Sequence, residues 1–277
     1  MGTLLRKAAS PEALNQAWKK LKTDKSVWDE GVSRQEMERN FVFHILKLAK
    51  ELENGKYKPV QIRMFPVLKG DGGRRLISSL TLKDKLAQRS VLAVLNPIGE
   101  EIFHHDSYGY RPGRSIDMVM GRIREHINCG FHWLVDADIK SFFDSIPHKP
   151  LKKKLKKAVS DKELLNLIFR WLDVGTPRTG ILTKRRGIPQ GGVLSPFLCN
   201  FYLTWFDHFL TDSNLPFVRF ADDFLIFTQT KKHACIALER VKTGLTALEL
   251  ELNHKKTKIV LSGPNVVFLG RKLPAPK

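Results

Sequence analysis

Cysteine is scarce in this sequence, and its few cysteines are not spaced as a metal site or a disulfide framework would require. The three residues, Cys129, Cys199 and Cys235, lie far apart and form no Cys-x-x-Cys pair. This spacing excludes the usual zinc motifs and gives no basis for disulfide pairing. Scattered free thiols are typical of a reducing compartment, so the sequence predicts a cytoplasmic protein.

Long apolar runs and targeting signals are also absent. No apolar stretch approaches the roughly 20 residues that cross a bilayer. The first residues, Met1–Lys7, lack the apolar core of a signal peptide, and Arg6 breaks the myristoylation pattern that Met-Gly begins. No internal repeat or low-complexity linker interrupts the 277 residues, a length that fits one large domain or two subdomains with a shared core.

Acidic residues are few compared with basic ones. The 47 Lys and Arg residues exceed the 28 Asp and Glu residues and give a formal charge of +19. This excess favours a polyanionic partner, nucleic acid before membrane, because neutralising phosphates releases their counterions. A generally basic soluble protein is the alternative.

Two adjacent carboxylates, Asp222 and Asp223, interrupt the apolar segment Phe217–Phe227. The pattern predicts a strand, a tight turn and a second strand, with both carboxylates at the tip. Neighbouring carboxylates repel each other, and Mg²⁺ relieves that repulsion while leaving positions open for substrate phosphates. For an isolated Asp-Asp pair, a solvated turn would be the better interpretation.

A second carboxylate element lies in Trp133–Ile139. Strand alternation places Asp136 and Asp138 on the face opposite the apolar side chains. A carboxylate at the end of such a strand suits a ligand that must be held still. We interpret Asp136 and Asp144 as supporting or structural residues.

Three basic residues, Lys69, Arg74 and Arg75, gather at the tip of a hairpin predicted over residues 61–77. Cations at that tip would suit a triphosphate, and Arg grips phosphate with two donors at once. A solvated basic hairpin is the alternative. The segment is not a P-loop, because the Gly-Lys-Ser/Thr ending is missing.

Two loops carry further candidate contacts. The first contains Tyr108, Tyr110, Arg111 and Arg114, which offer stacking faces and phosphate donors to nucleic acid, although a plain loop is nearly as consistent with the local sequence. The second places Gln190 before two glycines, which would allow a ligand or template backbone to come close.

Helices are predicted between these motifs from apolar periodicity and caps. Their approximate ranges are 11–22, 35–53, 81–96, 115–130, 149–173 and 237–250. Phe197, Phe201, Trp205 and Phe209 predict the buried stripe of one more helix. The lysines of 152–157 are first a solvated face and second a surface for a nucleic-acid backbone.

The order of these elements resembles the palm of reverse transcriptases, and the finer match is to the bacterial group II intron-like class. Four blocks over roughly residues 60–270 carry the resemblance: Tyr108–Ser115 (YGYRPGRS), Asp138–Asp144 (DIKSFFD), Pro189–Pro196 (PQGGVLSP) and Phe268–Gly270 (FLG). The combination is far more specific than any single motif in it.

The resemblance implies an α+β right-hand polymerase fold with fingers and palm, the palm being an antiparallel sheet backed by helices. It implies an N-terminal helical extension over 1–58, fingers over 59–130 and palm over 131–277, with part of 150–190 returning to the fingers. No later segment resembles a thumb, so the expectation is either that a non-coding RNA or a second protein supplies that grip, or that this chain is a fragment or a reduced enzyme.

The resemblance also implies RNA-templated addition of dNTPs to a primer 3′-hydroxyl with two Mg²⁺ ions. Asp138, Asp222 and Asp223 would be catalytic and would form the metal set with Ile139. Lys69, Arg74, Arg75, Gln190 and Phe143 would contact the incoming nucleotide, Phe143 at its sugar. Tyr108, Arg111, Arg114 and Lys256 would bind nucleic acid.

Three departures from related sequences accompany the match. Phe220 replaces the usual Tyr before Ala-Asp-Asp, Ser195-Pro196 differs from the Ser-Gln of diversity-generating enzymes, and the retron blocks are missing. Two alternatives stay open: a maturase-like protein that binds structured RNA and polymerises poorly, and a host-defence or CRISPR-associated polymerase.

Overall fold

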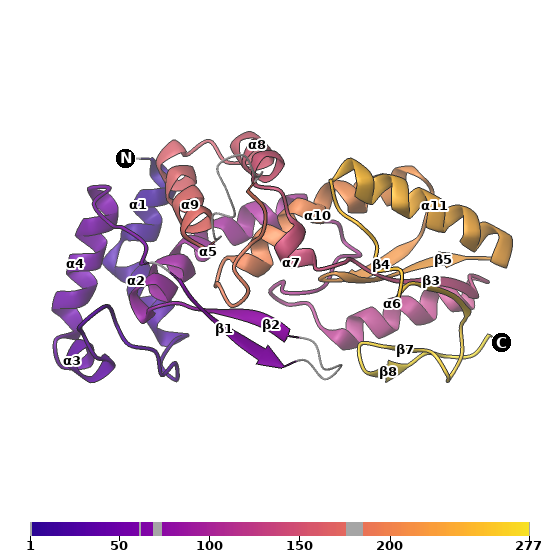
Figure 1. Cartoon of the computed structure of the whole chain (residues 1–277), viewed down its shortest axis with the longest axis horizontal. Coiled ribbons are helices and arrows are strands. Elements are labelled where there is room, and N and C mark those ends of the chain that lie inside the picture. Colours follow the sequence, from indigo (N-terminus) through magenta and orange to yellow (C-terminus); the bar gives the residue numbers. More distant parts are fainter. Residues whose placement is uncertain (1, 61, 69–73, 176–184, 277) are drawn as a thin grey trace. The chain divides into compact units, whose positions relative to one another are not determined.

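The computed structural model describes residues 2–60, 62–68, 74–175 and 185–276 (Figure 1). The predicted contact at Lys69 therefore lies outside the described residues. Clustering of contacts divides the chain into two compact units. Unit 1 comprises Met1–Glu101 and Pro147–Leu198, and unit 2 comprises Ile102–Ile146 and Cys199–Lys277.

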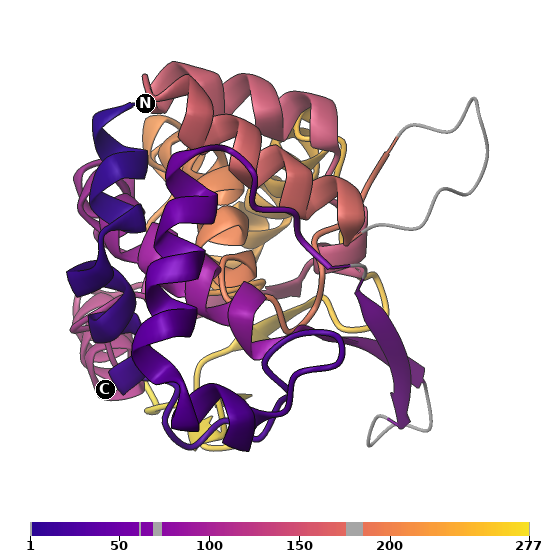
Figure 2. The same cartoon turned by 90° about the vertical axis from the view of Figure 1, so that its left-hand side faces the viewer.

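Unit 1 is mostly helical. Its elements are α1 (Thr3–Ala9), α2 (Pro11–Lys19), α3 (Arg34–Arg39), α4 (Phe41–Glu53), β1 (Arg63–Leu68), β2 (Arg74–Ser79), α5 (Leu82–Ile102, which ends at the start of unit 2), α8 (His148–Ala158) and α9 (Lys162–Val174). The indigo and purple helices α1, α2 and α4 lie side by side, and the β1–β2 hairpin projects from the helical part of the unit (Figure 2).

The helix predicted from Gln35 to Glu53 is divided in the structure. Asn40, with φ −115° and ψ 36°, lies outside the helical region between α3 and α4. Asn is prone to such breaks because its side chain competes for backbone hydrogen bonds. By contrast, α5 continues beyond its predicted end and passes through Pro97.

Unit 2 is built on one four-stranded antiparallel sheet. Its strands are β3 (Trp133–Asp138), β4 (Phe217–Phe220), β5 (Asp223–Thr228) and β6 (Lys258–Leu261), in the spatial order β4-β5-β3-β6. The other elements of this unit are α6 (Ile116–Asn128), α7 (Phe142–Ser145), α11 (Lys231–Ala247), β7 (Val267–Phe268), β8 (Arg271–Lys272) and most of α10 (Ser195–Asp212).

Helices cover both faces of the sheet. In Figure 1, α6 runs below the strands of unit 2 and α11 runs above them. Leu134, Leu225 and Phe227 from the strands pack with Ile123 of α6 in one buried cluster. On α10, Phe206 meets Phe224 of β5 edge to face, with ring centroids 5.4 Å apart. The predicted antiparallel sheet backed by helices is therefore confirmed.

The two units divide the chain differently from the predicted boundaries. Residues 1–58 belong to the same unit as the β1–β2 hairpin, and residues 102–130 belong with the sheet because α6 packs on β4. Residues 147–198 return to unit 1, a wider range than the predicted 150–190. Among the described helices, none combines the length and the apolar character that crossing a bilayer would need.

Candidate active site

Three carboxylates meet at one end of the sheet in unit 2. Asp138 is the last residue of β3 and stands opposite Asp223, the first residue of β5, across the antiparallel ladder. Phe220, the last residue of β4, pairs with Asp223, the first residue of β5. Ala221 and Asp222 form the short turn between them. The predicted hairpin is confirmed, and strand pairing brings together residues that are far apart in sequence.

The charges of the neighbouring carboxylates act electrostatically on Asp223. Desolvation, followed by the charges of Asp222 and Asp138, raises the pKa of Asp223 to about 6. The Asp223 side chain remains exposed, so solvent screens this effect. Neighbouring carboxylates supply the hard oxygen donors that a divalent cation prefers, so these residues fit Mg²⁺. Ile139, the residue after Asp138, is buried and bridges to Leu252.

The turn before β6 holds Asp138 from the other side. Asn253 donates from its side chain to Asp138 Oδ2 at 2.9 Å and from its backbone to Asp138 O at 2.8 Å. Lys256 Nζ lies 3.2 Å from Asp138 Oδ2, and this contact raises the Lys256 pKa. Lys256 was predicted to bind nucleic acid, and the structure places it beside a carboxylate. Asn253 was not predicted from the sequence, although it lies only three residues before Lys256 in the same polar turn.

The two carboxylates interpreted as supporting residues differ in their surroundings. Asp136 forms an ion pair with Lys258 of the neighbouring β6, with Nζ and Oδ2 3.4 Å apart. Burial raises the Asp136 pKa. Asp144 is exposed on α7.

The adjacent pair Phe142-Phe143 divides into one buried and one partly exposed ring. Phe142 is only 2% exposed, whereas Phe143 is partly open to solvent. Their ring centroids are 5.9 Å apart at an interplanar angle of 69°. Part of Phe143 is therefore accessible to solvent on α7, the short helix that follows Asp138 in the chain.

In unit 1, the loop around Gln190 joins the β1–β2 hairpin. Ser78 of β2 donates its N–H to Gln190 O at 2.7 Å. Gly191, at φ +101°, approaches so closely that a Cβ there would lie 2.8 Å from Ser78 O. Arg74 and Arg75 begin the same strand β2. Unit 1 thus brings Gln190 and the strand of both arginines into one substructure, whereas the three carboxylates belong to unit 2.

Two of the predicted nucleic-acid contacts are buried. Arg111 donates to the carbonyl oxygens of His104 and Ser107, both at 2.6 Å, and Tyr108 is also buried. This placement favours a supporting role for Tyr108 and Arg111 within the loop over direct contact with RNA. Arg114 is partly exposed and lies over the Tyr108 ring.

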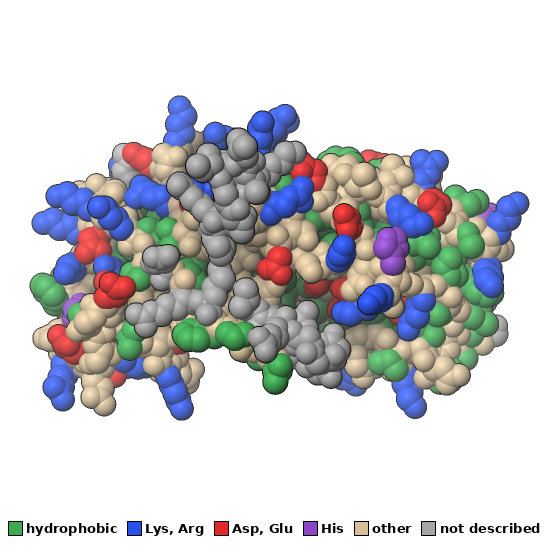
Figure 3. Space-filling model, viewed as in Figure 1, with side chains coloured by type: hydrophobic (Ala, Val, Ile, Leu, Met, Phe, Trp, Pro, Cys, Tyr) green, Lys and Arg blue, Asp and Glu red, His purple; other side chains and the backbone are tan. Residues whose placement is uncertain are grey.

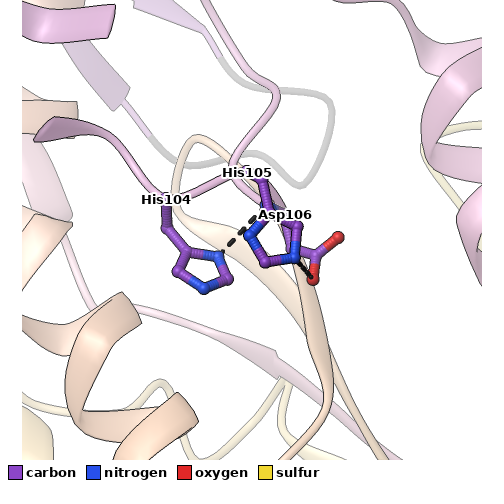
Figure 4. Close-up of side chains that lie close together, drawn as sticks. All are labelled: His104, His105 and Asp106. Carbon is purple, nitrogen blue, oxygen red and sulfur yellow. Dashed lines mark hydrogen bonds and ion pairs between the residues drawn. The ribbon is translucent and has the colours of Figure 1, made fainter. Parts of the chain in front are cut away.

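His104, His105 and Asp106 bring three potential metal ligands close together (Figure 4). The ring of His104 is already engaged, since Nδ1 accepts from Asp106 N and Nε2 bonds to Thr211 Oγ1 at 3.0 Å. Burial lowers the His104 pKa to about 4, so the ring is neutral. Asp106 pairs with Arg122 at 2.9 Å. We interpret His104, His105 and Asp106 as a structural hydrogen-bonded cluster of unit 2 and not as a cation site.

Comparisons with known proteins agree on one family. The sequence model described as "Reverse transcriptase (RNA-dependent DNA polymerase)" matches residues 67–273. The chain is 28% identical to Protein YkfC of Escherichia coli (strain K12), with 98% of this chain and 82% of that protein covered. It is 29% identical to the group II intron-encoded protein LtrA of Lactococcus lactis subsp. cremoris, with 93% of this chain and 42% of that protein covered.

A similar solved structure is the partial Cas6-RT-Cas1--Cas2 complex. The TM-score is 0.52 at 27% sequence identity, over 88% of this chain and 43% of that chain. The fold is therefore that of the fingers and palm of a polymerase. This chain spans most of YkfC but less than half of LtrA or of the solved chain.

Proposed function

The chain belongs to the reverse transcriptase family, and from this premise we propose that it copies RNA into DNA by adding dNTPs to a primer 3′-hydroxyl. The observation that carries the proposal is the meeting of Asp138, Asp222 and Asp223 at one end of the sheet in unit 2. Mg²⁺ bound there would activate the primer oxygen and stabilise the leaving pyrophosphate.

The residues of this chain would hold and orient the reacting groups. Asp138 and Asp222 would be the direct metal ligands, with Asp223 adding negative charge beside them. Asn253 and Lys256 fix the position of the Asp138 carboxylate, and a ligand held by second contacts loses less freedom on binding metal. The exposed face of Phe143 would lie against the sugar of the incoming nucleotide.

We assign unit 1 to the fingers and unit 2 to the palm. Support for this assignment comes from the loop of Gln190, which pairs with the strand that begins with Arg74 and Arg75. Two arginines on one strand suit a triphosphate because each guanidinium presents a planar pair of donors. Replacing both by Ala should raise the KM for dNTP and change RNA affinity less. Lost RNA affinity with a normal KM would contradict this assignment.

Primer extension by the purified protein tests the proposed activity. An RNA template with an annealed DNA primer should be extended in the presence of dNTPs and Mg²⁺, and chelation of the metal should stop extension. A DNA template of the same sequence is the matched comparison for template preference. The proposal fails if the folded protein binds the RNA template with its annealed DNA primer and does not extend the primer.

The same failure would favour a maturase-like protein that binds structured RNA. The charge of +19 supports this second candidate, and basic side chains predominate among the charged groups on the face drawn in Figure 3. On α8, Lys149, Lys153, Lys156 and Lys157 are exposed, and the helix contains no acidic residue.

A further inference from the structure

Arg219 of β4 is a completely buried charge. Its exposed fraction is 0%, as is that of Asp207 on α10. The two side chains form a bidentate ion pair, with Nε to Oδ1 at 2.7 Å and Nη2 to Oδ2 at 2.6 Å. A buried ion pair often contributes no more stability than apolar side chains of the same volume would. Its presence here therefore points to a geometric task in addition to packing.

The remaining nitrogen of Arg219 reaches the turn that carries the carboxylates. Nη1 donates to Ala221 O and to Asn200 Oδ1, both at 2.9 Å. Ala221 has φ +61°, in the left-handed region that a residue with a Cβ seldom adopts. The residue directly before Asp222 is thus held in an unfavourable conformation by a hydrogen bond to its own carbonyl.

Gly109 confines the same turn from the other side. A Cβ at Gly109 would lie 2.5 Å from Ala221 N and 3.3 Å from its Cα. Asn200 Nδ2 donates to Gly109 O at 2.6 Å, so one amide joins Gly109 to Arg219. The chain before Gly109 also runs along β4, since Arg219 N donates to Asp106 O and Tyr108 N donates to Arg219 O, both at 2.9 Å.

We propose that Arg219, Asp207, Asn200 and Gly109 form a positioning network that fixes the Ala221 turn and, through it, the metal-binding geometry of Asp222 and Asp223. All four residues belong to unit 2, like the carboxylates. The inference rests on the proposed metal role of those carboxylates. Metal ligands displaced by about 1 Å lose much of their effect. A variant that only shifts the Ala221 turn should therefore weaken metal binding and catalysis.

Gly109→Ala is the sharpest variant because it changes no charge and pushes directly on Ala221. Its matched control is Gly121→Ala on α6, where a Cβ would meet nothing within 4 Å. Asn200→Ser is a second variant, which removes the amide bridge without adding volume. Arg219→Ala is less informative, since it would leave Asp207 as an unpaired buried charge and destabilise the fold.

Two readouts separate positioning from general stability. The first is Mn²⁺ affinity of the protein without nucleic acid, measured by electron paramagnetic resonance in folded variants. The second is kcat for primer extension at saturating RNA, with KM for dNTP. We expect Gly109→Ala to weaken Mn²⁺ binding and lower kcat, each by at least ~10-fold, while RNA affinity and KM stay within about twofold. Asn200→Ser should show the same direction, and Gly121→Ala should resemble the wild type.

The inference is overturned if folded Gly109→Ala and Asn200→Ser bind Mn²⁺ as the wild type does. The Mn²⁺ titration needs no polymerisation, so it distinguishes this result from failure of the proposed function. Suppose that the wild-type protein extends no primer and that Gly109→Ala binds Mn²⁺ more weakly than the wild type. This pair of results would support the network and contradict the reverse transcriptase activity.

Discussion

Asp138 is the residue whose surroundings define the candidate site most clearly. Its carboxylate accepts from the Asn253 side chain, contacts Lys256 and faces Asp223 across the ladder. These contacts fix the carboxylate in one orientation, while Asp222 lies in the turn beside it. In the proposed metal site, Asp138 is held firmly and Asp222 is placed by a turn, so the conformation of that turn would decide how well the metal ligands converge.

Phe143 provides a prediction about sugar selection. In the proposed reaction, the partly exposed ring of Phe143 would collide with a ribose 2′-hydroxyl. Phe143→Ala should therefore raise the rNTP/dNTP ratio of kcat/KM by about 10- to 100-fold, which corresponds to relief of a clash of about 1.4–2.7 kcal/mol. Single-nucleotide incorporation with each substrate measures this ratio.

The buried neighbour of Phe143 is the matched control. Phe142→Ala removes a ring from the core and should destabilise the fold by about 3–5 kcal/mol without changing the ratio in the protein that remains folded. Unchanged discrimination in folded Phe143→Ala would show that the residue only packs.

Sequence motifs predicted some of these residues and were uninformative about others. Asp222 and Asp223 stood out because the other sequence blocks accompany them, since an isolated Asp-Asp pair would indicate a solvated turn. The structure shows that Arg111 is buried within its own loop, and the residue type in a motif does not indicate burial. Arg219 contacts Asp207 and Asn200 of α10, and Asn253 contacts Asp138 of β3. The local sequence of Arg219 and of Asn253 contains no sign of these tertiary partners.

Two helices of unit 2 end in the same hydrogen-bonding pattern with different residues at the left-handed position. After α6, Gly130 has φ +88°, and after α11, Glu249 has φ +55°. In both, the next residue donates its N–H back to a carbonyl in the last turn, as in Leu250 to Leu245. Glycine occupies this conformation without strain, whereas a residue with a Cβ does not.

Exchanging these residues tests the helix ends. Glu249→Gly should raise the free energy of unfolding by about 0.5–1 kcal/mol, and Gly130→Ala should lower it by about 1 kcal/mol. A Cβ at Gly130 would meet nothing within 4 Å, so its effect comes from the backbone alone. Urea denaturation of both variants measures the changes. If both variants lower the free energy of unfolding, the left-handed conformation of Glu249 is not a source of strain.

The aromatic stripe predicted on α10 shows how periodicity misleads over several turns. Phe197 and Phe201 are buried as expected, but Trp205 is 41% exposed and stacks on Phe209. A spacing of four residues advances about 40° too far per step on a helix of 3.6 residues per turn, so the stripe rotates out of the core. Tyr202 and Phe206 take over the buried face.

The basic face of α8 predicts a measurable salt dependence. Lys149, Lys153 and Lys157 lie one turn apart on an exposed face, and within the described part of the chain none of them forms an ion pair. Replacing all three by Gln should reduce the slope of log affinity for RNA against log salt by about 2, at about 0.7 per lost contact with a single strand.

The matched control for α8 is Lys152→Gln. Lys152 Nζ pairs with Asp173 at 2.8 Å, so it should contribute less to RNA binding. Fluorescence anisotropy over a salt series measures both slopes. If the triple variant keeps the wild-type slope, α8 is a solvated face and the RNA contacts lie elsewhere.

For the whole molecule, charge and carboxylates point to different tasks. The excess of Lys and Arg suits attraction of a polyanion, whereas the acidic cluster at the end of one sheet suits a metal. If both interpretations hold, RNA binding and chemistry are separable. The sequence predicted the two kinds of surface, because composition and motifs report them directly. It did not predict that residues 102–130 pack with the sheet, since that depends on tertiary contacts of α6.

Comparison of Asp222→Asn with the wild type in primer extension and RNA binding tests this account most directly. The variant keeps the size of the side chain and removes the charge, and loss of a metal ligand should lower extension by at least ~1,000-fold, or about 4 kcal/mol of transition-state stabilisation. RNA affinity should stay within about twofold. Asp144→Asn, at an exposed carboxylate on α7 of the same unit, should extend normally. Extension by Asp222→Asn at a rate near that of the wild type would contradict the assignment of this site.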